Sequence, residues 1–453
     1  MNRIRLVLGL DTSTSGRRRT SDQGLTLVEV MVAMLVFTII SVAVAMSLGN
    51  SLVISKNSRA RTVAVNLASQ DLDLQRAVAD VFAVQTKTWV TPVQGTNYTI
   101  NRQVNWVSSS TATSACGTGT GTLQFKTVRD TVTWPGNATG VATSTVLAPN
   151  GRINDPTLGT IVVAVTGASG AGVSGVTATI TPTSGGAAVT TPALTDANGC
   201  TYALKVTPGT YTIAISRAGS LDIKQNATVS TSRAVTAGTA TSVSFTYDAA
   251  APFTLKYASN YTSGPTAQLP NNLDVTVTST TAGQYSFKPG TTNPVSLFPF
   301  TSPYVIETGA YVPAGTTTST GADASCLNVD PGQWTTANAA KAVGTSFTAG
   351  STPGTAKTVN VPMGVVNLSA LTGTLGITAT SVNTKPAGDP GCAATTTYTF
   401  NAVSGSPTLA LPFGTWRLAA VASILTLNAT SIPTGGTINS DGTVTLDPRG
   451  VTQ

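Results

Sequence analysis

The sequence contains no histidine and carries little charge. Without histidine the chain lacks the commonest general base and the commonest metal ligand, so a His-dependent catalytic triad is excluded. Only 9% of the 453 residues are charged, and a net charge of +7 spread over so long a chain does not indicate a nucleic-acid partner. No glycine-rich phosphate loop ending in Lys-Ser or Lys-Thr occurs either. We therefore expect no enzyme activity, no cofactor and no metal.

Cysteine is also scarce, and the four that occur lie far apart: Cys116, Cys200, Cys326 and Cys392. No Cys-x-x-Cys pair is present, which argues against a zinc site. An even number of separated cysteines in an exported region is typical of disulfides, and four cysteines allow three pairings. The sequence alone does not choose among them. Because Cys326 and Cys392 share the C-terminal half, we expect them to pair, which leaves Cys116 with Cys200.

The sequence contains a single long apolar run, which lies near the N-terminus. No residue from Val30 to Leu48 is charged, and as a helix this run nearly spans the hydrocarbon core of a bilayer. Three arginines at 17–19 precede it, so the positive-inside rule keeps its N-terminal side cytoplasmic and places the chain after Lys56 outside. Glu29 stands near the head of the run, where a charge is costly in lipid.

Three interpretations of this run differ in how they treat Glu29. A secretory signal peptide, cleaved after Ala43-Val44-Ala45, explains neither the length of the run nor the glutamate. A plain single-pass anchor explains the length and leaves Glu29 unexplained. A third interpretation explains both, and it rests on a family resemblance that the residues around Glu29 carry.

The stretch Gly24-Leu25-Thr26-Leu27-Val28-Glu29-Val30 resembles the cleavage motif of type IV prepilins and pseudopilins. The resemblance implies that a prepilin peptidase cuts between Gly24 and Leu25 and that Leu25 is then N-methylated. It also implies that Glu29 pairs with the terminal amine of a neighbouring pilin subunit in an assembly helix, where two buried charges that are costly alone become tolerable as a pair. Leu25 departs from the phenylalanine that the family mostly has, and this departure concerns methylation more than cleavage.

The same resemblance implies a leader over 1–24. Beyond the apolar run the spacing of apolar residues stays helical, so we expect a helix over 25–82. Gly49 is its weak point, since glycine costs about 1 kcal/mol relative to alanine within a helix. Asp71 interrupts the apolar stripe of the second half, and we expect Asp71 and Asp73 to be solvated. The stripe consists of Ala60, Val63, Leu67, Leu74, Val78 and Val81.

Alternating residues over 83–150 predict a small β-sheet that covers this stripe and forms a globular head. The head contains, in this order, the motifs RQVNWV at 102–107, Cys116, TVTWP at 131–135 and STVLAP at 144–149. This order loosely resembles the heads of PilV-like minor pilins. Trp106 and Trp134 are best explained as core aromatics of this head rather than as ligand-stacking residues.

Three β-sandwiches are expected after a turn-rich linker at 150–156. Thr-Asp-Ala-Asn-Gly at 195–199, a strand, and Pro-Gly-Thr-Tyr-Thr at 208–212 resemble the CnaB-type, carboxypeptidase-regulatory-like β-sandwich, which would cover 158–250. The first strand has no lysine, so the isopeptide bond of some CnaB domains is not implied. Further strand patterns predict sandwiches over 251–335 and 358–453, with a linker at 335–357. Gly-Thr-Trp at 414–416 repeats Gly-Thr-Tyr at 209–211, which indicates a divergent module.

Together these features predict an α+β chain with a long hydrophobic N-terminal helix, a small β-sheet pilin head and several all-β, immunoglobulin-like sandwiches. The expected function is that of a type IV minor pilin with an adhesive role toward a host or surface ligand. It would cross the inner membrane once and then become extracellular in a pilus. The sandwiches are too bulky to repeat around every turn of a thin fibre, which favours a minor subunit. A type II secretion pseudopilin and a non-assembling, membrane-anchored carbohydrate-binding module are the alternatives.

Overall fold

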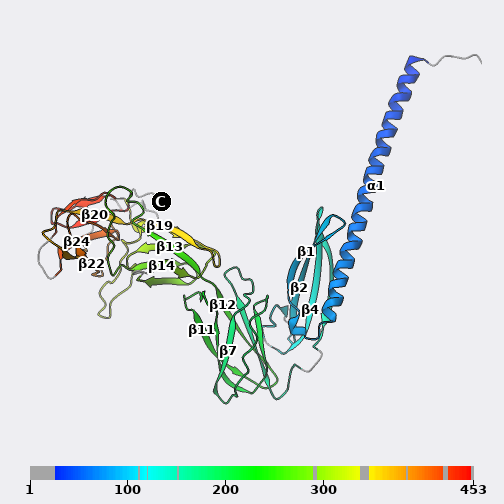
Figure 1. Ribbon diagram of the computed structural model, residues 1–453, viewed down its shortest axis with the longest axis horizontal. Coiled ribbons are helices and arrows are strands. Elements are labelled where there is room, and N and C mark those ends of the chain that lie inside the picture. The colour runs from blue at the N-terminus through cyan, green and yellow to red at the C-terminus, as the bar shows by residue number, and fades with distance from the viewer. Residues whose placement is uncertain are drawn as a thin grey trace, which may run out of the picture. The chain divides into compact units, whose positions relative to one another are not determined.

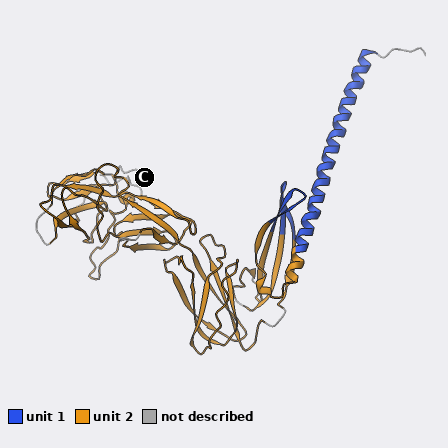
Figure 2. Cartoon of the chain, in the orientation of Figure 1, with its two compact units in different colours: residues 1–70, 90–100, 131–142 blue, residues 71–89, 101–130, 143–453 orange. Residues whose placement is uncertain are grey.

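The computed structural model describes residues 26–110, 113–119, 121–149, 153–288, 293–336, 346–383, 386–421 and 427–449. Within them, one long helix, α1 (Leu27–Arg76), is followed by strands that form seven sheets (Figure 1). This confirms the expected fold class. The chain divides into two compact units, coloured in Figure 2: residues 1–70, 90–100 and 131–142 form the first, and the rest forms the second.

Helix α1 is continuous over 50 residues. Gly49 does not interrupt it. The helix ends at Arg76, earlier than the expected 82, and a short 3-10 helix, η1 (Val81–Ala83), follows. Asp80 begins the next element: its backbone is extended, and its side chain accepts a hydrogen bond from the N–H of Phe82, which caps η1 as a separate element.

The head is one sheet, in the order β1-β2-β4-β5, with β3 paired to β2. Its strands are β1 (Lys87–Val93), β2 (Thr96–Ser108), β3 (Thr113–Ser114), β4 (Leu123–Trp134) and β5 (Asn137–Leu147). Burial alternates along β2 and β4, as the sequence pattern predicts. Gln94 and Gly95, both at positive φ, form the two-residue turn between β1 and β2. Trp106 and Trp134 are buried, in agreement with their interpretation as core aromatics.

The first sandwich packs two sheets face to face, in the orders β10-β12-β6-β8 and β11-β9-β7. Its strands are β6 (Gly159–Thr166), β7 (Thr177–Ser184), β8 (Cys200–Val206), β9 (Gly209–Ser216), β10 (Ser220–Asp222), β11 (Thr228–Val235) and β12 (Ala240–Ala249). Their inward residues, among them Val163, Tyr211 and Tyr247, form one buried core.

The second sandwich is built from the sheets β16-β13-β19 and β15-β14-β17-β18. Its strands are β13 (Ala251–Tyr257), β14 (Val275–Ser279), β15 (Gly283–Phe287), β16 (Val295–Leu297), β17 (Tyr304–Thr308), β18 (Thr348–Ala349) and β19 (Lys357–Val361). The sequence pattern predicts β18 within a linker and most of β19 within the third sandwich. Instead β19 pairs in parallel with β13, about a hundred residues earlier, a contact that no local pattern reveals. A second 3-10 helix, η2 (Pro331–Gln333), precedes β18.

The third sandwich consists of the sheets β23-β20-β25 and β22-β21-β24-β27-β26. Its strands are β20 (Gly364–Leu368), β21 (Leu375–Ser381), β22 (Thr397–Val403), β23 (Thr408–Leu411), β24 (Gly414–Ala420), β25 (Ala429–Ser431), β26 (Gly436–Ile438) and β27 (Val444–Leu446). The repeated Gly-Thr-aromatic motif opens β9 and β24 in the same way. Tyr211 donates its hydroxyl to the carbonyl of Thr207, and the indole N–H of Trp416 donates to the carbonyl of Pro412, each four residues upstream.

Candidate functional site

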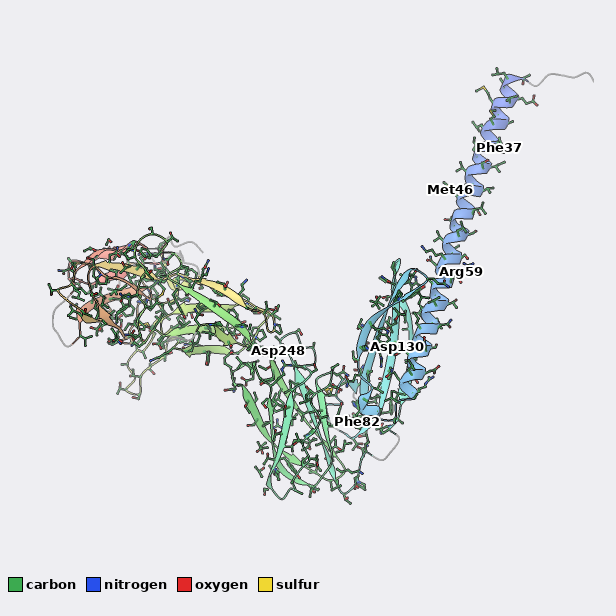
Figure 3. All side chains as sticks on the ribbon, viewed as in Figure 1. Phe37, Met46, Arg59, Phe82, Asp130 and Asp248 are labelled. Carbon is green, nitrogen blue, oxygen red and sulfur yellow. A yellow bond between two sulfur atoms is a disulfide. The ribbon has the colours of Figure 1, made fainter. Side chains whose placement is uncertain are left out.

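The first half of α1 presents apolar side chains to solvent on every side. All residues from Leu27 to Ile54 are exposed, and none of the most apolar 18-residue window is buried within the chain (Figure 3). By length and composition this helix is able to cross a membrane. A helix that is apolar all round is stable in water only when lipid or other helices cover it, and none of the described residues of this chain does so.

Glu29 lies in the first turn of this helix and is exposed. Its N–H donates to the carbonyl and, more weakly, to the hydroxyl of Thr26, which caps the helix. The first turn is where the helix dipole favours a carboxylate. None of the ion pairs formed between described residues involves Glu29. Its partner residues in the expected cleavage motif, Gly24 and Leu25, lie outside the described residues.

The second half of α1 is buried along one face, which Ala64, Ala68, Asp71 and Leu72 form. Leu72 packs with Val84, Val104 and Val128 in a small core. Leu74, assigned to the apolar stripe from the sequence, is 60% exposed, so that assignment is wrong.

Asp71 is buried rather than solvated, which corrects the sequence analysis. Its carboxylate lies 3.0 Å from Nε of Arg102 on β2, and the Arg102 guanidinium lies over the ring of Trp89. Asp73 does remain at the surface, in an exposed pair with Arg76. The ionic contact of Asp71 therefore links the end of α1 to the head sheet.

A third charged residue, Asp130 on β4, completes this cluster in the interior of the head. Its side chain is fully buried. Burial, together with the neighbouring Asp71 carboxylate, raises the pKa of Asp130 to about 7, against the opposing effect of Arg102. With Asp130 protonated, the buried cluster reduces to one neutral pair of Asp71 and Arg102, which avoids a net buried charge.

Sequence reasoning missed this cluster, although a signal for it existed. Burial alternates along β2, so Arg102 shares the inward face with Ile100 and Val104. Likewise Asp130 follows Val128 at a spacing of two on β4. A charged residue at an inward position of a strand indicates a buried partner, and here two strands carry one.

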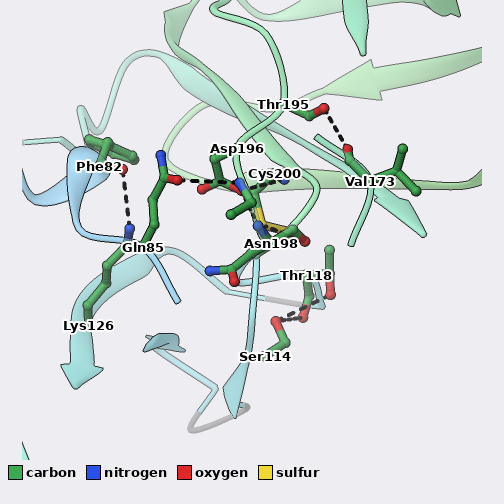
Figure 4. Close-up of a disulfide and its surroundings, with 12 residues drawn as sticks. Phe82, Gln85, Ser114, Thr118, Lys126, Val173, Thr195, Asp196, Asn198 and Cys200 are labelled. Carbon is green, nitrogen blue, oxygen red and sulfur yellow. Dashed lines mark hydrogen bonds between the residues drawn. A yellow bond between two sulfur atoms is a disulfide. The ribbon is translucent and has the colours of Figure 1, made fainter. Parts of the chain in front are cut away.

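The junction between the head and the first sandwich holds a buried lysine (Figure 4). Lys126 Nζ donates to the carbonyls of Val84 at 2.8 Å and Phe82 at 3.5 Å, and it lies 5.1 Å from the ring centre of Trp106. Burial lowers the pKa of Lys126 to about 8, which Asp196 of the first sandwich partly offsets.

Two disulfides join Cys116 to Cys200 and Cys326 to Cys392, the pairs expected from the sequence. The first connects the head to the start of β8 and lies in a shared core with Trp106 and Val162. The second connects the loop after β17 to the loop before β22, and so ties the second sandwich to the third. Among the described residues no cluster of acidic residues and cysteines is arranged to hold a metal ion.

Comparison with known families identifies the segment that carries Glu29. Residues 19–45 match the prokaryotic N-terminal methylation motif. These residues form a prepilin-type segment. This confirms the resemblance on which the expected cleavage and assembly residues rest, and the match extends from Arg19 through most of the apolar run. No curated protein matches the chain.

Several solved structures are distantly similar to the chain. The Bacillus anthracis TIE protein is 10% identical over 81% of this chain and 73% of its own, with a TM-score of 0.20. A Streptococcal ancillary pilin is 11% identical over 52% of this chain and 75% of its own, with a TM-score of 0.19. BcpA, the major pilin subunit of Bacillus cereus, is 12% identical over 64% and 91%, also with a TM-score of 0.19. Such TM-scores are too low to bear on the function of this chain.

Proposed function

We propose that this chain is a pilin-like structural subunit of a cell-surface filament, held in the filament by α1. The observation that carries the proposal is the exposed apolar half of α1, which starts inside a methylation motif and has Glu29 in its first turn. Such a surface gains the free energy of burial only when lipid or helices of other subunits cover it.

Processing would release the new N-terminus four residues before Glu29. A prepilin peptidase cuts between Gly24 and Leu25, and Leu25 is methylated. The terminal amine of one subunit then pairs with the Glu29 carboxylate of a neighbour within the apolar bundle of helices. Breaking a buried ion pair by removing one partner costs about 3–5 kcal/mol, which makes this pair decisive for assembly.

The three sandwiches support a minor, displayed position in the filament. They account for most of the chain after the head, and a subunit of that bulk fits a fibre tip better than every turn of a shaft. We further propose that the chain crosses the inner membrane once before assembly, becomes extracellular afterwards, and presents its sandwiches for adhesion to a host or surface ligand.

Substitution of Glu29 tests the assembly step. The variant Glu29→Val keeps Gly24 and lowers the cost of inserting the helix by a few kcal/mol, so processing and membrane retention should persist. Assembly should fail, because a neighbour's amine is left buried and unpaired. The measurement is immunoblotting of membrane and sheared-filament fractions, combined with the intact mass of the processed chain.

Asp73→Val is the matched control, because Asp73 is an exposed acidic residue on the same helix, and this variant should enter filaments normally. Filaments that contain Glu29→Val at the wild-type level would contradict the assembly role of Glu29. Recovery of the wild-type protein with a secretion machine, and never with sheared filaments, would favour a pseudopilin. A mature protein that starts at Met46 would support the signal-peptide interpretation instead.

A further inference from the structure

A cleft of about 670 Å³ lies where α1 passes the tips of two hairpins of the head, and all of its lining belongs to the first compact unit. One wall is the stretch of α1 from Leu52 to Val63. The opposite wall is the β1–β2 turn around Gln94 and Gly95, together with Trp134 and Pro135 at the end of β4. Figure 3 labels Arg59 on the helix wall.

The lining of this cleft carries two cations and no anion. Lys56 and Arg59 are both exposed, and among the described residues neither takes part in an ion pair. Amide side chains of Asn57, Gln94 and Asn97 add neutral hydrogen-bonding groups around them. Two cations surrounded by amide groups suit a ligand in which a phosphate group is joined to a part with hydroxyl groups.

The position of the cleft along α1 points to a bilayer surface. Lys56 is the first charged residue after Glu29, and a helical rise of 1.5 Å per residue separates the two by about 40 Å. A bilayer with its headgroup regions is about 40–45 Å thick. With Glu29 at one face of the membrane, Lys56 and the cleft lie among the headgroups of the other face.

The side chains around the cleft agree with this depth. Trp134 and Tyr98 line it but are buried core aromatics of the head, so the interfacial groups are Lys56 and Arg59. Lysine and arginine at a membrane–water interface reach toward lipid phosphates. Leu52, 72% exposed on the apolar side of the cleft, is placed to contact acyl chains.

We propose that this cleft binds the headgroup of an anionic phospholipid, with Lys56 and Arg59 on the phosphate, and thereby holds the head at the membrane surface before the subunit is extracted into a filament. The proposal rests on the membrane-anchored state of the proposed function. A carboxylate of a second copy of this chain is the competing anion, and a low protein-to-lipid ratio keeps it out of the test.

The test reconstitutes the full chain in phosphatidylcholine vesicles that contain spin-labelled phosphatidylglycerol or spin-labelled phosphatidylcholine. The motionally restricted fraction of each label gives the preference of the protein for the anionic lipid. The wild type should prefer phosphatidylglycerol, and Lys56→Gln and Arg59→Gln should each reduce that preference about fivefold. Lys56→Arg and Arg59→Lys should keep it.

Arg61→Gln is the matched control, because Arg61 is exposed on the same helix and does not line the cleft. It should leave the preference within about twofold of the wild type. An equal loss in Arg61→Gln and the cleft variants would mean diffuse surface charge and would overturn the site. Vesicle flotation separates the two proposals: a chain that floats without lipid preference overturns only the cleft, whereas a chain that does not float overturns membrane anchoring as well.

Discussion

The two halves of α1 belong to one continuous helix and differ in how their side chains are buried. From Leu27 to Ile54 every side chain is exposed, and the helix is apolar on all sides. After Arg59 one face is covered by the head, and the small residues Ala64 and Ala68 on that face are fully buried. The difference teaches that the first half finds no cover among the described residues, whereas the second half finds its partner in the head of the same chain.

The acidic residues of the two halves follow the same division. Asp71 in the docked half has Arg102 of the same chain as its counter-ion. Glu29 in the free half has no counter-ion among the described residues, and we propose that a neighbouring subunit provides one. A buried carboxylate needs a partner in either case, and only the origin of that partner differs.

The largest expected effect comes from removing the counter-ion in the docked half. Arg102→Met leaves the buried Asp71 unpaired, so the free energy of opening of the head should fall by about 3–5 kcal/mol. Native-state amide hydrogen exchange of β2 and β4 measures this locally, without assuming that the multidomain chain unfolds in one step. Arg76→Met, which breaks only the exposed pair with Asp73, should cost at most about 1 kcal/mol. Equal losses of stability in the two variants would show that the buried and the exposed ion pair stabilise the head to the same extent.

Truncation of leucines along the same helix sharpens the comparison. Leu72→Ala should destabilise the head by about 2–5 kcal/mol, because Leu72 is buried against Val104 and Val128. Leu74→Ala and Leu35→Ala, both at exposed positions, should change the stability of the head by no more than about 0.5 kcal/mol. Chemical denaturation of the detergent-solubilised chain, followed by head-specific hydrogen exchange, gives the three values. A destabilised head in Leu35→Ala would show that the free half also supports it.

The last expected effect is a pH dependence of the head, on which the second half of α1 is docked. The pKa of Asp130 is raised from 3.8 to about 7, so between these values the folded head binds a proton that the unfolded chain does not. The stability of the head should therefore be greatest at low pH within this window and fall as pH rises toward 7. In Asp130→Asn this slope should disappear.

The second sandwich supplies an internal control for that experiment. Burial, assisted by Asp330, raises the pKa of Glu307 to about 8, so this sandwich should lose stability over its own pH window whether or not Asp130 is present. Hydrogen exchange at pH 5 and pH 8 reports both regions in one sample. An unchanged slope of the head in Asp130→Asn would contradict the assignment to Asp130.

Local patterns predicted the elements of this chain better than their ends and partners. The apolar run predicted the exposed half of α1, and alternation predicted the strands of the head. The stripe that included Leu74 was wrong, because burial follows the face that meets the sheet, and that face is centred on Ala68 and Leu72. Asp71 looked like a solvated interruption because its counter-ion is 31 positions later in the sequence, on a strand whose packing against α1 is not a local property.

By itself the sequence determined what repeats over a few residues. Helical and strand periods can be read locally, because side-chain direction repeats every 3.6 or 2 residues. The length of the apolar run, the methylation motif and the absence of histidine follow directly from the order of the residues and their composition. Only the tertiary structure decided which distant groups meet: Arg102 and Asp130 at Asp71, β19 beside β13, and the cleft between α1 and the hairpin tips. These contacts depend on how whole elements pack, since each joins residues whose separation along the chain carries no periodic signal.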